Sequence, residues 1–268
     1  MIKCGIYLDV ENLIRCGGRG MNYASIIKFV EAQGAKAFLA NAYMAQDVER
    51  EAQDYSYRIK RKENRAWIRR QGFRLVLKRV QRFSDEDGEI ITKANADLDL
   101  AVDALQQSTN LDYILLGTGD GDFLPLARTL QSHGKRVDLL GFQNVSRVLQ
   151  DEVDRFHSGF LVPGILPLEN GRFRGVLHSI YEDKGYGFLA CYCSPTASFM
   201  RDDVFLHINH CRVENGEAVT MATMVEWKNQ QTILEFAIEE DQKNRLNARN
   251  VSKANVHAGK VETKKASS

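Results

Sequence analysis

Four aspartates stand where an α/β fold would bring distant parts of the chain together. Asp9 follows an apolar run, Asp97 opens an apolar helical stretch, and Asp120 and Asp122 come after the apolar run 113–116. In an open parallel sheet, ligands bind just beyond the carboxyl ends of the strands. Carboxylates from several such ends would meet in one pocket, where only a cation makes their approach tolerable. The pattern predicts divalent-metal chemistry acting on phosphate.

These acids also have ordinary structural alternatives. An aspartate directly after a strand often caps a helix or occupies a turn, and this alternative stays open for Asp9 and Asp122. Glu11 is expected to be solvated or structural, and Asp103 is expected to form hydrogen bonds on a helix surface. The acidic run 85–89 is expected to be a solvated turn.

The elements that would position the aspartates alternate along residues 1–157. Short apolar runs predict strands at 4–8, 35–43, 73–77, 113–116 and 136–140. Helical patterns occupy 23–33, 47–71, 97–107 and 123–133, and Gly34, Gly72 and Gly134 follow three of them, as expected for helix C-caps. Strand and helix in alternation are typical of a parallel sheet wound by right-handed crossovers. The predicted fold class is α/β, with helices flanking a parallel sheet.

The pattern changes near residue 158. Two of the four prolines, Pro163 and Pro167, fall in the stretch 158–171, which is predicted to be a linker. Residues 172–252 form short, turn-rich, strand-like runs that predict a small β-barrel. The polar segment 253–268 is predicted to be a disordered tail.

The bulk composition is that of an ordinary globular protein and points to no partner. Of 268 residues, 44% are apolar and 26% charged, with a formal net charge of +1. Apolar runs fall short of the ~20 residues of a membrane span, and no signal-peptide pattern opens the chain, so a cytoplasmic location is expected. Cys191 and Cys193 lack a matching second pair, which argues against zinc. Both, with Cys211, are expected to pack as apolar residues.

Three motifs in order give the first 157 residues a family resemblance. They are Gly5-Ile-Tyr-Leu-Asp-Val-Glu-Asn-Leu13, the set Lys93, Asp97 and Asp103, and Gly117-Thr-Gly-Asp-Gly-Asp-Phe123. In order and spacing they resemble the NYN (LabA-like) domain of the PIN-like nucleases. The resemblance implies cleavage of RNA that depends on a divalent metal.

The chemistry of phosphodiester hydrolysis suggests a role for each polar residue. Mg²⁺ or Mn²⁺ held by carboxylates can activate a water and stabilise the leaving oxygen. Asp9 and Asp120 are the first choices as ligands, followed by Asp122 and Asp97. The remaining predicted site residues are Asn12, to orient a water or phosphate oxygen, Thr118, to bond a phosphate or orient a carboxylate, and Lys93, to neutralise substrate charge.

One basic segment stands out from the balanced charge. Residues 48–82 contain 12 Lys or Arg against 4 Asp or Glu. On a single helix over 47–71, Arg58, Lys62, Arg65 and Arg69 recur at three- and four-residue steps and form a stripe. The stripe would track RNA phosphates with salt-sensitive affinity. The alternative is a solvated, charged helix face.

Residues 172–252 carry a second resemblance. Two segments resemble the RNA-binding strand motifs of the cold-shock domain, an OB-type barrel. They are Lys184-Gly-Tyr-Gly-Phe-Leu189 and Asp203-Val-Phe-Leu-His207. The family's exposed Trp and following Phe fall on Ser179 and Ile180, so one stacking surface is missing. A barrel used only for packing or protein contacts is the alternative. The resemblance implies a stacking platform of Tyr186, Phe188, Phe205 and His207, with Lys184 on phosphate.

Together these features predict a metal-dependent ribonuclease whose barrel captures single-stranded RNA. A catalytically silent RNA-binding regulator and an interaction scaffold are the rival predictions. No membrane partner is expected, and a homodimer is possible because PIN-like relatives often dimerise.

Overall fold

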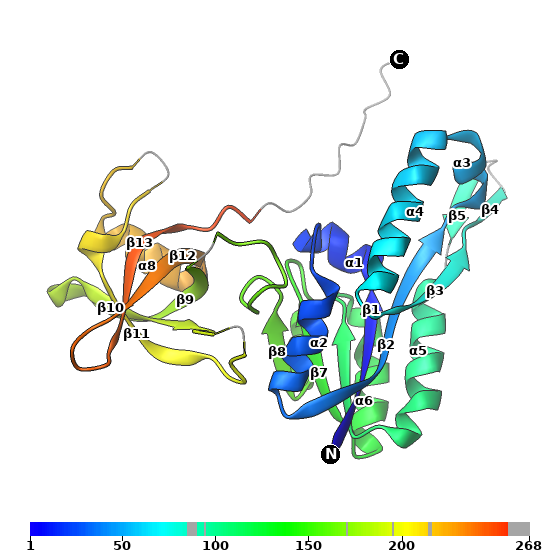
Figure 1. Ribbon diagram of the computed structural model, residues 1–268, viewed down its shortest axis with the longest axis horizontal. Helices are drawn as coiled ribbons and strands as arrows, with labels where there is room; N and C mark the ends of the chain where they lie inside the picture. The colour runs from blue at the N-terminus through cyan, green and yellow to red at the C-terminus, as the bar shows by residue number, and fades with distance from the viewer. Residues whose placement is uncertain (85–89, 94, 170, 195, 214–215, 257–268) are drawn as a thin grey trace. The chain divides into compact units, whose positions relative to one another are not determined.

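The computed structural model describes residues 1–84, 90–93, 95–169, 171–194, 196–213 and 216–256. The chain forms two compact units, Met1–His157 and a second unit that begins at Ser158 (Figure 1). Three predicted features lie outside the described residues: the turn at 85–89, the side chain of Lys93, and the tail from 257 onwards.

The first unit is built on a six-stranded sheet in the order β3-β2-β1-β6-β7-β8. The pairs β2–β3, β1–β2, β1–β6 and β6–β7 are all parallel. The chain reaches β6 from β3 through α5, so the first strand lies in the middle of the sheet. The predicted α/β fold class is confirmed. The strands are β1 (Ile2–Asp9), β2 (Ala35–Gln46), β3 (Arg74–Arg79), β6 (Tyr113–Gly117), β7 (Arg136–Gly141) and β8 (Arg155–Ser158).

Helices cover the sheet because its strands alternate apolar side chains toward both faces. Tyr7 packs in one core cluster with Leu100 of α5 and Leu130 of α6. Its neighbours Ile6 and Leu8 point to the other face and are fully buried. The helices are α1 (Val10–Leu13), α2 (Tyr23–Ala32), α3 (Val48–Gln53), α4 (Tyr55–Arg70), α5 (Ala96–Gln107), α6 (Leu124–Ser132) and α7 (Arg147–Glu152).

Two local features of the first unit differ from the prediction, and one agrees with it. The single helix predicted over 47–71 is wrong, because Asp54 interrupts it with extended backbone angles (φ −116°, ψ 102°). The Asp54 carboxylate accepts a hydrogen bond from the Tyr57 N–H at 2.9 Å and so starts a second helix. A short antiparallel pair, β4 (Gln81–Ser84) and β5 (Ile90–Lys93), was not predicted. Gly34 has the positive φ (81°) expected for its C-cap position.

The second unit is a closed five-stranded barrel in the order β10-β11-β13-β12-β9. A single parallel contact, between β11 and β13, closes it, and the arrangement is consistent with an OB-like domain. An unpredicted helix, α8 (Met221–Asn229), places Met224 and Trp227 in the barrel core. The strands are β9 (Arg172–Tyr181), β10 (Tyr186–Cys191), β11 (Arg201–His207), β12 (Ile233–Glu240) and β13 (Leu246–Lys253).

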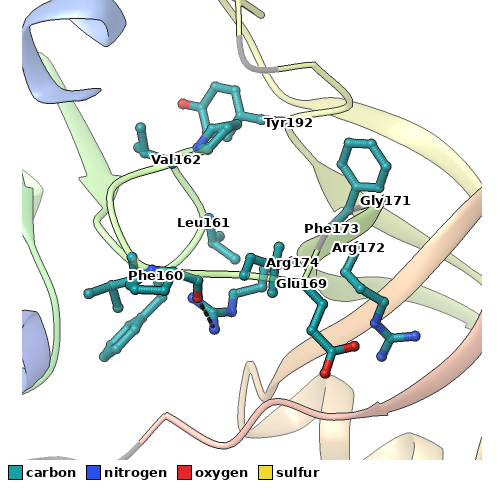
Figure 2. Close-up of a pocket in the computed structure, with 14 residues that line it drawn as sticks. Phe160, Leu161, Val162, Glu169, Gly171, Arg172, Phe173, Arg174 and Tyr192 are labelled. Atoms are coloured by element: carbon teal, nitrogen blue, oxygen red, sulfur yellow. Dashed lines mark hydrogen bonds between the residues drawn. The ribbon is translucent and has the colours of Figure 1, made fainter. Parts of the chain in front are cut away.

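A pocket of about 500 Å³ lies within the second unit between the segment 160–168 and β9 (Figure 2). Arg174 forms part of its wall, pairs with Glu235 at 2.8 Å, and donates a hydrogen bond to the Pro167 carbonyl at 3.3 Å. Phe160 and Ile165 of the same segment are buried. The stretch predicted as a linker is therefore fastened to the barrel at one point at least.

Candidate active site

Two neighbouring strands end at the same edge of the sheet and carry the first acids there. Leu8 of β1 pairs with Gly117 of β6, so Asp9 and Thr118 follow directly at that edge. Asp9 is 8% exposed and caps α1 by accepting a hydrogen bond from the Asn12 N–H at 3.0 Å. The capping alternative for Asp9 is thus correct, and it holds the carboxylate at the strand end.

Asn12 ties the two halves of the site together. Its side-chain oxygen accepts a hydrogen bond from the Gly119 N–H at 2.8 Å, across 107 positions of sequence. A Cβ on Gly119 would lie 3.3 Å from that oxygen and 3.3 Å from the Cα of Val145, so glycine permits this close approach. The amide oxygen of Asn12 is therefore engaged within the protein, and the residue positions the loop.

The loop after β6 is held by its own side chains. Thr118 is 1% exposed, and its hydroxyl accepts a hydrogen bond from the Asp120 N–H at 3.1 Å. Asp120 in turn accepts one from the Asp122 N–H at 3.0 Å. Of the two roles predicted for Thr118, this contact supports orientation of the neighbouring carboxylate. Asp120 is half-buried and Asp122 is exposed.

The four aspartates act on one another electrostatically, and we call them the acidic edge (Asp9, Asp97, Asp120 and Asp122). Burial raises the pKa of Asp9 to about 6; the Asn12 N–H opposes this, and the charges of Asp97 and Asp120 add to it. Burial, then the charges of Asp120 and Asp122, also raise the pKa of Asp97. Like charges held this close favour a bound cation.

The residues that the structure describes form no closed metal cage, so a cation could bind at the acidic edge only through one or two carboxylates. Among the residues described, no three His, Cys, Asp or Glu side chains lie close enough to hold an ion by themselves. Magnesium commonly uses one or two carboxylates and keeps several waters, which leaves room for a substrate oxygen. Asp9 and Asp120 match that requirement.

Arg15 is a site residue that the sequence interpretation missed. It is exposed on the segment Ile14–Gly18 that follows α1, a helical turn that is kinked at Gly17 (φ 112°). Its charge lowers the pKa of both Asp9 and Asp97, so Arg15 acts electrostatically on the acidic edge. The Gln143 N–H donates to the Cys16 carbonyl at 2.9 Å and holds this turn. The basic, glycine-rich run after the Asp-Val-Glu-Asn motif was the available signal.

The basic helix has a different geometry from the one predicted. Arg58, Lys62 and Arg69 are exposed on α4, whereas Arg65 is buried and ion-paired with Glu51 of α3. Arg61 donates to Glu11 at 2.7 Å and to the Ala45 carbonyl at 2.9 Å. Glu11 is thus structural, as expected. Two arginines fasten α4 to the unit, and three of the four predicted stripe residues remain free to meet solvent.

The barrel carries a group of one exposed and three half-buried rings, the aromatic face (Tyr181, Tyr186, Phe188 and Phe205). The Tyr186 and Phe205 rings lie 5.3 Å apart, and Phe188 lies 6.0 Å from Phe205. Tyr181 stacks on Tyr186 at 4.8 Å and is 48% exposed. It follows Ser179 by two residues on β9 and adds a fourth ring to this face. Sequence reasoning missed it because Tyr181 reaches Tyr186 only through the β9–β10 register.

A groove of about 540 Å³ adjoins the aromatic face. Its wall combines Tyr186, Phe188 and Phe205 with the polar residues Asp203, Asn244, Arg245 and Asn247. Lys184 is exposed in the turn before β10. His207 is half-buried, and its Nδ1 accepts a hydrogen bond from the Asn209 N–H at 3.3 Å, so this ring caps a turn.

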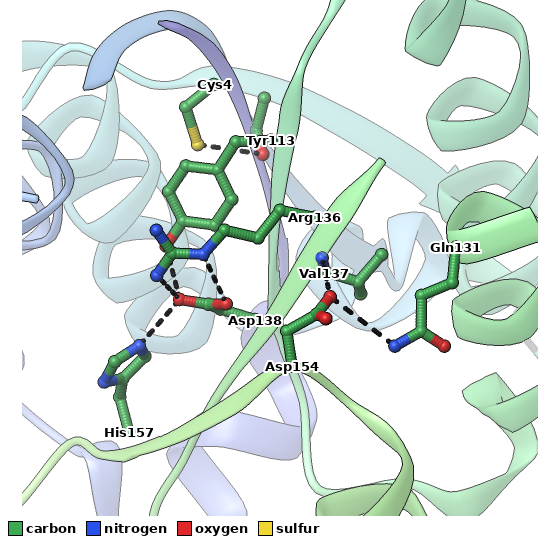
Figure 3. A network of polar contacts seen from close by, with 9 residues as sticks. Cys4, Tyr113, Gln131, Arg136, Val137, Asp138, Asp154 and His157 are labelled. Carbon is green, nitrogen blue, oxygen red and sulfur yellow. Dashed lines mark hydrogen bonds and ion pairs between the residues drawn. The ribbon is translucent and has the colours of Figure 1, made fainter. Parts of the chain in front are cut away.

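A second acidic centre lies nearer the amino ends of the strands, and we call it the buried acid centre (Asp138, Arg136, His157 and Tyr113; Figure 3). Asp138 is fully buried. Its carboxylate accepts hydrogen bonds from the Arg136 Nε at 2.9 Å and the Tyr113 hydroxyl at 3.0 Å, and it lies 2.8 Å from His157 Nε2. Burial would raise the pKa of Asp138, but His157 and Arg136 lower it below its usual range.

Comparisons with known proteins cover mainly the first unit. The family model of the NYN domain matches residues 3–166, a range that contains the whole acidic edge. None of the curated proteins compared with the chain matches it. A crystal structure of a protein of unknown function from Vibrio parahaemolyticus RIMD 2210633 shares 26% identity, covering 59% of this chain and 92% of that one, with a TM-score of 0.47. No helix in the described ranges is long and apolar enough to span a membrane.

Proposed function

The chain belongs to the NYN domain family of PIN-like nucleases, and from that membership we propose that it is a metal-dependent ribonuclease acting on single-stranded RNA. The observation that carries the proposal is the acidic edge. Asp9 and Asp97 have raised pKa values, and none of the four aspartates forms an ion pair with another described residue. Carboxylates that lie close together and form no ion pair, with raised pKa values, are typical of a site that binds a ligand.

The four aspartates of the acidic edge would have two roles, to coordinate the metal ion and to set the electrostatic potential around it. Asp9 and Asp120 would hold Mg²⁺ or Mn²⁺, which when bound activates a water and stabilises negative charge on phosphate. Asp97 and Asp122 add negative charge around the ion. The Asn12 backbone N–H holds the Asp9 carboxylate. The side chains of Asn12 and Thr118 accept hydrogen bonds from the Gly119 and Asp120 N–H groups and so hold the loop that carries Asp120. Arg15 would meet a phosphate oxygen of the substrate.

The second unit would capture RNA as a cold-shock-type barrel. Bases would stack on the aromatic face, worth roughly 1–3 kcal/mol per base. Lys184 and the exposed Arg58, Lys62 and Arg69 of α4 would meet phosphates, which makes the affinity salt-dependent. Two modest binding surfaces on one chain reinforce one another through effective concentration.

The decisive experiment is cleavage of an end-labelled, unstructured RNA with Mn²⁺, Mg²⁺ or EDTA. Wild type is compared with Asp120→Asn and with the matched control Asp151→Asn, an exposed aspartate of α7. We expect metal-dependent products from wild type and Asp151→Asn alone, while Asp120→Asn still binds RNA. Equal products from all three proteins would reject the site.

One observation favours a second candidate, a catalytically silent RNA-binding regulator. Within the part of the chain that the structure describes, no three donor side chains are pre-assembled around an ion. The same assay separates the candidates. RNA bound by wild type in a salt-dependent manner, with no product in either metal, would select the regulator.

A further inference from the structure

The barrel contains a pair of cysteines whose sulfur atoms meet. Cys191 ends β10, and Cys193 follows two residues later. Their Sγ atoms lie 3.2 Å apart, within hydrogen-bonding distance for thiols. Cys191 is buried and Cys193 is half-buried. The expectation that both sulfurs simply fill apolar space does not account for this contact.

The surroundings give the two thiols different properties. The hydrogen bond from Cys191 and then the charge of Arg201 lower the pKa of Cys193, although burial opposes them. The hydrogen bond and burial together raise the pKa of Cys191. Arg201 is the cross-strand partner of Cys191, so β11 places this cation beside the pair. The half-buried outer sulfur therefore loses its proton more readily than the buried inner sulfur that lies 3.2 Å from it.

The other three cysteines lack these features. Cys4, Cys16 and Cys211 are buried, and burial raises the pKa of each thiol. Cys211 donates a hydrogen bond to the His207 carbonyl, and Cys4 to the Gly5 carbonyl. Thiols of this kind are inert compared with an accessible thiolate beside a second sulfur. They serve as internal references for the pair.

We propose that Cys191 and Cys193 form a reversible thiol–disulfide site for hydroperoxides, with Cys193 as the attacking thiol and Cys191 as the resolving thiol. The Cys193 thiolate attacks a peroxide oxygen, the O–O bond breaks, and the released hydroxide takes a proton to become water. The Cys191 sulfur then attacks the sulfenic acid on Cys193, the S–O bond breaks, and the Cys191 proton leaves with the hydroxyl as a second water. The sulfur pair loses two electrons and the peroxide gains them.

The site has a defined neighbourhood. Arg201 pairs with Asp203 through hydrogen bonds of 2.8 and 2.5 Å, and Asp203 lines the groove beside the aromatic face. The ion pair between Arg201 and Asp203 therefore connects the thiol pair to that groove. Its chemistry does not depend on the proposed ribonuclease activity.

The test uses the full-length, fully reduced protein and hydrogen peroxide. After brief exposure, free thiols are alkylated and peptides are mapped by mass spectrometry. We expect a disulfide between Cys191 and Cys193 that dithiothreitol reverses, formed at least about tenfold faster than any oxidation of Cys211, since thiolate content sets the rate. Uniform oxidation of all five cysteines, or only irreversible acids at Cys193, would overturn the proposal.

Serine variants assign the two roles. Cys191→Ser should trap a sulfenic acid on Cys193 that dimedone labels, whereas Cys193→Ser should leave Cys191 unoxidised. Cys211→Ser is the matched control and should form the disulfide at the wild-type rate. Equal oxidation of Cys191 with and without Cys193 would reject the assignment. The wild-type peptide map decides the existence of the site even if a variant fails to fold.

Discussion

Buried carboxyl groups at the two ends of the sheet have pKa values that are shifted in opposite directions. Asp138 in the buried acid centre is surrounded by donors and has a lowered pKa. Asp9 at the acidic edge is nearly as buried, yet other carboxylates are among its neighbours and its pKa is raised to about 6. A buried carboxylate that has hydrogen-bond and ion-pair partners within the protein stabilises the fold. A buried carboxylate among other carboxylates favours the binding of a cationic ligand. The same substitution at the two positions should therefore have opposite consequences.

The largest expected effect is on stability, from Asp138→Asn. The amide would leave the Arg136 charge unpaired, at a cost of about 3 kcal/mol in the free energy of unfolding. Cleavage per folded molecule should not change. Hydrogen exchange of the β6 and β7 amides measures the loss, with Asp151→Asn as the control. Wild-type exchange rates would contradict a structural role for Asp138.

The matched substitution at the other end, Asp9→Asn, should affect cleavage instead. Asparagine caps a helix as well as aspartate does, so α1 should be preserved. Because ionised Asp9 is unfavourable to the fold above pH 6, the free energy of unfolding at neutral pH should not fall. Loss of a metal-holding carboxylate should lower single-turnover cleavage by about 100-fold or more. If Asp9→Asn unfolds more easily than wild type and still cleaves RNA, then Asp9 has the structural role that we assign to Asp138.

A smaller effect is expected from Arg15, the cation that acts on the acidic edge. Arg15→Gln should lower cleavage about tenfold, because one charge-assisted hydrogen bond to phosphate is lost. Arg19→Gln, an exposed arginine past the same turn, is the matched control and should cleave like wild type. If both variants lose activity equally, only the general positive charge of this loop matters.

The smallest expected effect is the change with pH in the free energy of unfolding, which should have opposite signs for Asp9 and Asp138. Because the folded-state pKa of Asp9 is raised from 3.8 to about 6, its contribution to stability is present below 3.8 and lost as pH rises through 6. Mg²⁺ at about five times its Kd should restore about 1 kcal/mol above pH 6 and much less at pH 5. Asp138 has a lowered pKa, so its contribution is present above 3.8 and lost as pH falls below it.

Thermal unfolding across this pH range, with and without Mg²⁺, measures both trends. The control for the metal effect is Asp9→Asn, which should show no pH-dependent gain on adding Mg²⁺. A metal effect of equal size at pH 5 and pH 7 would place the ion away from Asp9.

The sheet could be predicted because its strands are continuous apolar runs separated by helical patterns. The short α1, the β4–β5 pair and α8 could not, since four-residue elements and half-buried helices leave little periodicity. The break at Asp54 was missed because one side-chain hydrogen bond overrides an otherwise helical pattern. Local chemistry of this kind is visible only when the backbone is known.

The acidic edge could be anticipated because strand ends are the natural places for site residues in such a sheet. The roles of Asn12, Arg15 and Tyr181 depend on contacts between chain segments that no local pattern encodes. Arg65 shows the converse, because helical spacing placed it in an exposed stripe and a partner on α3 turned it inward. Sequence predicts where polar residues gather, and packing decides which of them remain available.

The bond between Asn12 and Gly119 also has a consequence for the order of events during synthesis. A ribosome has made Asp9 and Asn12 long before it adds the strand and loop that complete the acidic edge. A nascent chain that stops short of Gly119 lacks the partner of Asn12 and carries no Asp120. Interrupted translation before this point would therefore release fragments that lack a complete acidic edge.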